Sequence, residues 1–195
     1  MNWPLNNPTI TQPFAANPGD YDQFGYPAHN GLDLWTGDAP PWVYAFETGI
    51  VEKVGWEAGG YGKYVVLRHL ISGLLVFSYY AHLQTVYAHT GQPLGAGFVL
   101  GEMGSTGNSS GPHLHFGIRN EYYIGPYKGF IDPLPILRGS GIPWAKETDI
   151  DSSPLSPPAG RPPSKPWVLP GSFGRLVPAI IGRHGRTMYR MKKQF

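Results

Sequence analysis

Residues 104–119 read GSTGNSSGPHLHFGIR, a glycine-rich polar run that leads into a segment of alternating apolar and polar residues. Alternation with a period of two is typical of a β-strand that has one buried face and one polar face. A strand from Pro112 to Arg119 places Leu114, Phe116 and Ile118 on one face and His113, His115, Gly117 and Arg119 on the other. Two imidazoles therefore point away from the core together, and this spacing favours a shared site over two separate structural histidines.

Four further segments have the composition of short strands, because they are rich in β-branched and aromatic residues and bounded by glycine. They are Gly49 to Val54, Tyr64 to His69, Leu74 to His82 and Phe98 to Met103. The 195 residues include 27 glycines and 21 prolines, and no segment has the period of a long amphipathic helix. We predict a mainly β protein, an antiparallel β-sheet domain with few helices.

A second polar cluster lies in His29-Asn30-Gly31-Leu32-Asp33, where a histidine and a carboxylate are four residues apart. The Asn-Gly pair argues against a helix and predicts a turn that leads into a strand. Such a turn can bring His29 and Asp33 together. Taken alone, the segment is read more readily as an ordinary turn with a surface histidine and a surface aspartate.

A third histidine ends the apolar strand Tyr79-Tyr80-Ala81-His82-Leu83. Strand alternation places His82 on the same face as Ser78 and Tyr80. Tyr26 and Tyr80 are conceivable hydrogen-bond donors to a developing negative charge, but tyrosine is common in strands. We therefore assign neither tyrosine a role.

The three clusters together contain the donors of a catalytic metal site. The chain has no cysteine, so any metal ion must be held by His, Asp or Glu. A catalytic zinc ion takes three protein ligands and leaves a fourth position open. Five groups are available, and three ligands leave two histidines outside the metal shell: His29, Asp33, His82, His113 and His115. His69, at the end of another predicted strand, is expected to have a structural or surface role.

The three clusters also resemble known signatures. HNGLD, YYAHL and GSTGNSSGPHLHF are similar to the motifs of the lysostaphin and LytM-type zinc endopeptidases, and the resemblance runs from about Thr9 to Leu137. It implies an antiparallel β-sheet of the duplicated hybrid motif type, with the metal in a groove on one face. It also implies a substrate, the glycine-rich bridges or the stem and cross-link peptides of bacterial peptidoglycan.

The resemblance distributes the roles that the residues alone leave open. It implies that His29, Asp33 and His115 hold one Zn²⁺ ion, and that His82 and His113 form a catalytic pair. One of the pair takes a proton from the attacking water, and the other stabilises the oxyanion or protonates the leaving amine. Neither the residues nor the resemblance says which histidine is the general base.

The charge is divided between two parts of the chain. Residues 1–152 carry seven basic and all 13 acidic residues, whereas residues 153–195 carry eight basic residues and no acid. We predict a LytM-type metallopeptidase domain over 1–140, a Pro-rich linker over 141–170 and a basic tail over 171–195. The tail either docks on a partner, such as a phage virion or tail protein, or is a solvated basic end. No motif for nucleic-acid binding accompanies it.

Two observations bear on where the chain acts. No run of 18 apolar residues is present, so we expect no transmembrane segment, and the first residues lack the features of a secretory signal. We therefore expect a protein that acts at the bacterial cell wall, associated with a virion or released at lysis. Two alternatives remain for its function: a non-catalytic LytM-like module that binds and activates a partner hydrolase, and a structural zinc module within a larger particle.

Overall fold

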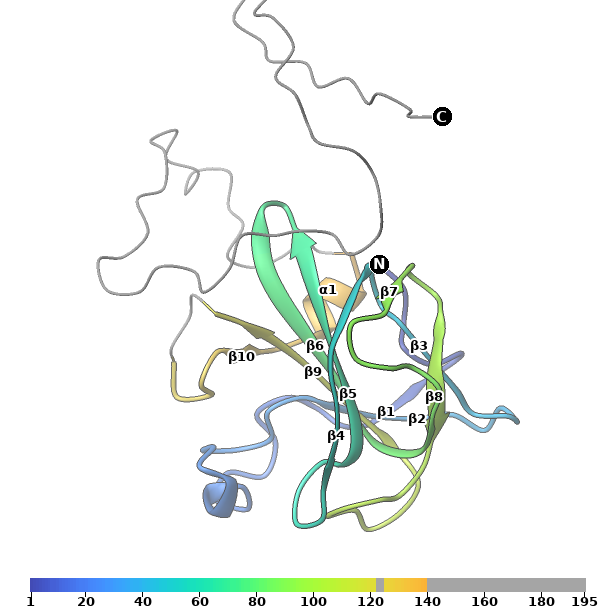
Figure 1. Ribbon diagram of the computed structural model, residues 1–195. Coiled ribbons are helices and arrows are strands. Elements are labelled where there is room, and N and C mark those ends of the chain that lie inside the picture. The colour runs from blue at the N-terminus through green and yellow to red at the C-terminus, as the bar shows by residue number, and fades with distance from the viewer. Residues whose placement is uncertain (122–124, 140–195) are drawn as a thin grey trace, which may run out of the picture. The chain divides into compact units, whose positions relative to one another are not determined.

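The computed structural model describes residues 1–121 and 125–139, so the predicted linker and basic tail lie outside the described residues. The described residues form a ten-stranded sheet whose main path is β1-β2-β9-β6-β5-β4-β7, with every pair antiparallel (Figure 1). The strands are β1 (Thr9–Gln12), β2 (Leu32–Trp35), β3 (Trp42–Tyr44), β4 (Gly49–Glu57), β5 (Gly62–Ile71), β6 (Leu74–Val86), β7 (Pro93–Leu94), β8 (Val99–Met103), β9 (Leu114–Asn120) and β10 (Phe130–Ile131). The helical elements are the short 3₁₀ helix η1 (Asp22–Phe24) and the helix α1 (Leu134–Leu137). The predicted antiparallel architecture with few helices is confirmed.

The long hairpin of β5 and β6 lies at the centre of the sheet and pairs with β9 through β6 (Figure 1). Its turn consists of Ser72 and Gly73, both with positive φ, of 51° and 79°. Positive φ at both turn residues matches the right-handed twist of the two strands, and the register begins at the pair Ile71 and Leu74. The turn therefore fixes which residues of β6 face the partner strands.

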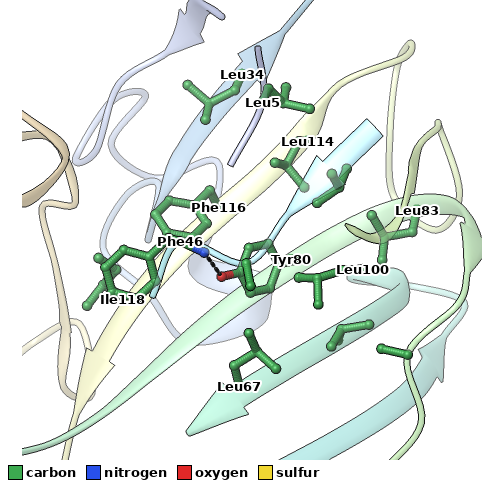
Figure 2. Close-up of a cluster of buried hydrophobic side chains, with 14 of the residues drawn as sticks. Leu5, Leu34, Phe46, Leu67, Tyr80, Leu83, Leu100, Leu114, Phe116 and Ile118 are labelled. Atoms are coloured by element: carbon green, nitrogen blue, oxygen red, sulfur yellow. Dashed lines mark hydrogen bonds between the residues drawn. The ribbon is translucent and has the colours of Figure 1, made fainter. Parts of the chain in front are cut away.

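The main hydrophobic core covers one face of the sheet. The alternation predicted for the decisive strand is confirmed, because Leu114, Phe116 and Ile118 of β9 are fully buried. Figure 2 shows the ring of Phe116 beside Phe46 and Tyr80, with ring centroids 5.7 and 5.3 Å away. The Phe46 N–H donates a 3.0 Å hydrogen bond to the Tyr80 hydroxyl. Tyr80 is thus a core residue that no substrate can reach.

A β-bulge interrupts β6 at His82. Between Val65 and Lys63 of β5, the partner in β6 changes from Tyr80 to Leu83, so β6 carries one extra residue there. His82 has a φ of 61°, in the left-handed region. A bulge re-aims the side chain that it contains. The expectation that His82 shares a face with Ser78 and Tyr80 is therefore wrong: both of these lie in the core, and the imidazole of His82 lies on the opposite face.

Within the described residues, no helix has the length and apolar character needed to cross a bilayer.

Candidate metal centre

The cluster of His29 and Asp33 and the cluster of His113 and His115 meet where β2 pairs with β9. Asp33 and His115 are directly opposite each other in the register of the two strands. His29 lies just before β2, and the chain bends at Gly31 so that Nε2 of His29 lies 2.9 Å from Nδ1 of His115. Gly31 permits this approach, since a Cβ there lies only 2.7 Å from both Cε1 of His115 and the carbonyl oxygen of Phe116. The prediction that the Asn-Gly pair leads into a strand is confirmed, but the structure has a bend at Gly31 in place of the predicted turn.

Three side-chain atoms form a small triangle at this point. Nε2 of His29 lies 2.9 Å from Nδ1 of His115. Oδ1 of Asp33 lies 3.1 Å from Nε2 of His29 and 3.0 Å from Nδ1 of His115. All three side chains are nearly buried, with the carboxylate side chain 12% exposed. Among the described residues, these three form the group whose ligand atoms lie close enough together to hold one metal ion.

A hydrogen bond outside the triangle directs the lone pair of His29 into it. Nδ1 of His29 donates to the carbonyl oxygen of Pro13 at 2.9 Å, and a carbonyl only accepts, so Nε2 carries a lone pair. Burial alone raises the pKa of the Asp33 carboxyl, but the close contacts with His115 and His29 outweigh it and hold the pKa well below its usual range, so the carboxylate is ionised. Burial lowers the pKa of His115, which favours its neutral form. Its Nε2 is buried without a hydrogen-bond partner among the described residues.

The donor set fits a zinc-type ion. Ligand atoms about 2.0 to 2.2 Å from a tetrahedral zinc ion lie about 3.3 to 3.6 Å apart, a few tenths of an ångström wider than the edges of the triangle. Two neutral imidazoles and one ionised carboxylate are a common set of three ligands at catalytic zinc sites. The three side chains therefore have the donor types and nearly the spacing that a zinc-type ion requires.

Two more histidines lie beside the triangle. The ring centroids of His82 and His113 are 4.6 Å apart, and the ring of His82 is 6.0 Å from that of His115. Nδ1 of His82 donates to the carbonyl oxygen of Thr106 at 2.8 Å, and Nδ1 of His113 donates to that of Gly111 at 2.8 Å. Both rings therefore keep Nε2 free to accept a proton. Nε2 of His113 lies 3.7 Å from Oδ2 of Asp33.

All five side chains line one cavity of about 540 Å³. Residues from the segment between β1 and β2 form part of its lining, and the turn after β4 and the polar loop before β9 form the rest. The lining residues outside the five are Gln12, Asp20, Tyr21, Gln23, Phe24, Tyr26, Asn30, Glu57, Gly60, Tyr61, Asn108, Ser109 and Ser110. The cavity is thus a polar and aromatic groove that lies over the histidine cluster.

Comparison with known proteins places this groove in a family. The profile of Peptidase family M23 matches residues 27–127, which include all five side chains. The chain belongs to peptidase family M23. The match covers just over half of the chain and ends in the connection between β9 and β10.

Individual relatives of this M23 domain agree with the assignment. The chain is 35% identical over 89 residues to the peptidoglycan DD-endopeptidase ShyC of Vibrio cholerae, a match that covers 46% of this chain and 19% of that protein. It is 26% identical to the catalytic domain of lysostaphin from Staphylococcus simulans, with a TM-score of 0.52 over 67% of this chain and 90% of that one. It is 25% identical to the catalytic domain of the prophage-encoded M23 protein EnpA from Enterococcus faecalis, with a TM-score of 0.52 over 66% and 90%. The matches to the first curated relatives span only about a fifth of those proteins.

The M23 groove also contains two residues that the sequence reasoning missed. Nδ2 of Asn30 donates to the Tyr61 hydroxyl at 2.8 Å, and the Tyr61 ring lies 5.5 Å from that of His115. Burial raises the pKa of Tyr61 well above its usual value, so its hydroxyl stays protonated. Asn30 was read only as a turn residue, and Tyr61 lies in a glycine-rich turn with no motif of its own. Of the structural or surface role expected for His69, the structure has the former: the side chain is buried and bonded to the Thr48 carbonyl and to Ser78.

Proposed function

We propose that this M23 domain is a zinc-dependent endopeptidase that hydrolyses the peptide cross-links or stem peptides of bacterial peptidoglycan. One observation carries the proposal: two imidazole nitrogens and a carboxylate oxygen converge within 3.1 Å, beside two further histidines in the same groove whose Nδ1 atoms bond to main-chain carbonyls. The name of the relative ShyC supports the substrate class.

His29, Asp33 and His115 would hold one Zn²⁺ ion. When bound, such an ion lowers the pKa of a water molecule toward neutrality and polarises a carbonyl oxygen. The carbonyl of Pro13 keeps the lone pair of His29 on Nε2, and the pairing of β2 with β9 holds Asp33 against His115. The ligands are thus oriented by main-chain contacts, which reduces the cost of assembling the site.

His82 and His113 would carry the proton transfers. Each has its proton on Nδ1 and an open Nε2, the state needed to accept a proton from water. A protonated histidine can then donate to the leaving amine or to the developing oxyanion. Because both rings have the same tautomer, we assign the roles of base and acid to the pair and not to one member.

No observation favours the two alternative functions. A non-catalytic module of this kind typically lacks ligands, whereas all five positions are filled here. A structural zinc site is usually closed by four protein ligands, whereas three converge here. Association with a phage particle through the basic tail stays a prediction, since the tail lies outside the described residues. Copurification with virions would test it.

The decisive experiment is digestion of purified peptidoglycan sacculi with the zinc-loaded protein, with bound metal quantified and product peptides identified by mass. We expect new amino termini with the wild type, no cleavage and reduced zinc with Asp33→Ala, and normal zinc with little cleavage for His82→Ala and His113→Ala. Zinc binding without cleavage, across several wall chemistries, overturns the endopeptidase proposal. Full activity of either histidine variant overturns its proposed role.

A further inference from the structure

The orientation of His82 depends on a contact outside the histidine cluster. Its backbone has a φ of 61°, which a non-glycine residue adopts only when its surroundings impose it. The bulge that turns the ring into the groove also interrupts the ladder between β5 and β6, where Lys63 is opposite Leu83. Something must satisfy the main-chain groups at this interruption and hold the ring in place.

Thr106, in the polar loop before β9, makes those contacts. Its hydroxyl accepts a hydrogen bond from the Lys63 N–H at 2.9 Å and donates one to the Leu83 carbonyl at 2.9 Å. Its own carbonyl oxygen accepts the Nδ1 proton of His82 at 2.8 Å. One residue therefore bridges the two strands at the bulge and fixes the tautomer of the histidine that the bulge presents.

The loop that carries Thr106 is packed tightly against the turn before β5. Asn108 N–H donates to the Gly60 carbonyl at 2.9 Å, and a Cβ on Gly107 would collide with the backbone of Gly60 and Gly62. The loop and the turn both contribute to the lining of the groove. With the loop anchored on both sides, the carbonyl that His82 bonds to has a defined position.

We propose that Thr106 is a positioning residue for His82, acting through its side-chain hydroxyl. The inference rests on the proposed endopeptidase function, in which His82 transfers a proton. Without the hydroxyl, the Lys63 N–H and the Leu83 carbonyl lose their shared partner, the loop loosens, and the Thr106 carbonyl no longer holds the Nδ1 proton of His82. The predicted metal ligands come from other segments and keep their positions.

The test uses Thr106→Val, Thr106→Ser and the control Thr85→Val on the zinc-loaded protein. Thr85 lies in the same strand as His82, and its hydroxyl makes no hydrogen bond within the part of the chain that the structure describes. A misplacement of about 1 Å near the reacting groups can cost about 100-fold in rate. We expect Thr106→Val to lower kcat by about 10- to 100-fold with KM within about twofold and zinc content unchanged, Thr106→Ser to recover most of kcat, and Thr85→Val to match the wild type.

A second readout needs no activity. The Nδ1 proton of His82, held by the Thr106 carbonyl, is expected to give a slowly exchanging imidazole N–H signal by NMR in the wild type and in Thr106→Ser, and to exchange rapidly in Thr106→Val. An unchanged signal and kcat in Thr106→Val overturn the proposal, as does an equal loss of kcat in Thr106→Val and Thr106→Ser. If the wild type cleaves no wall peptide, the proposed function fails, and the NMR comparison still decides whether Thr106 positions His82.

Discussion

Gly31→Ala is the substitution with the sharpest expected effect on the metal centre. Gly31 lies between His29 and Asp33 in sequence and packs against the ring of His115, so a side chain there would disturb the site where the three predicted ligands meet. A Cβ there lies 2.7 Å from Cε1 of His115 and 2.7 Å from the Phe116 carbonyl oxygen, whereas ordinary contact begins at 3.4 Å. The neighbours must therefore move by about 0.7 Å, and one of them is the backbone of the central strand β9.

That displacement exceeds what a metal site tolerates. Metal–ligand distances in working sites stay within about 0.2 Å of their ideal values. Removing a residue that orients a metal ligand typically weakens metal binding by about 10- to 100-fold. In Gly31→Ala the ligand itself is displaced. We expect zinc affinity to fall by about 100-fold, at the upper end of this range. Forcing a methyl group into a packed site also lowers the free energy of unfolding by about 1 to 3 kcal/mol.

Zinc affinity is measured by competition with a chelating dye, and stability by urea unfolding of the metal-free protein. Gly95→Ala is the matched control, because a Cβ at Gly95 meets nothing within 4 Å. The control should bind zinc as the wild type does. If Gly31→Ala binds zinc as tightly as the control, the assignment of the ligands, or the close approach at Gly31, is wrong.

Three further results are expected. Phe116→Ala should lower the free energy of unfolding by about 3 to 5 kcal/mol in urea titrations, whereas Trp56→Ala, at a residue 60% exposed, should change it little. Burial lowers the pKa of His69, so the unfolded chain binds a proton at this residue more readily than the folded protein does. The free energy of unfolding should therefore fall as pH drops below about 6.5, with His69 contributing at most about 1.4 kcal/mol per pH unit. The fall should be less steep in His69→Gln. Free Zn²⁺ at a hundred times its Kd should stabilise the wild type by about 2.7 kcal/mol and leave Asp33→Ala unchanged, as thermal unfolding can show.

The sequence predicted the buried and exposed faces best in strands where apolar and polar residues alternate without interruption. In β9 every second residue is apolar and buried, so the faces of Leu114 and His115 follow directly from the pattern. The short strands β3, β7 and β10 have two or three residues each, too few for a pattern, and each pairs with a longer neighbour that offers main-chain partners. No local signal could have predicted them.

The face of His82 shows where pattern reasoning fails. An extra residue in β6 reverses the alternation at that position, and the bulge depends on Thr106, 24 residues further along the chain. The pairing that joins Asp33 to His115 spans 82 residues and likewise has no local signature. The residues alone gave five candidate groups, and the family resemblance chose three of them as ligands. The geometry brings the same three together, while their roles stay a prediction.

The tautomers of the histidines show a further limit of sequence reasoning. Four imidazoles donate their Nδ1 proton to a main-chain carbonyl, namely His29, His69, His82 and His113. A carbonyl fixes the tautomer as a carboxylate does, but it brings no negative charge that would favour the protonated ring. Among the described residues, the carboxylate that contacts the cluster is that of Asp33, at the predicted metal ligands. Because every residue has a carbonyl, no substitution of the side chains at these acceptors removes the bond directly. Only a shift of the backbone does, and for this reason a loop anchor such as Thr106 can control a histidine that its side chain does not touch.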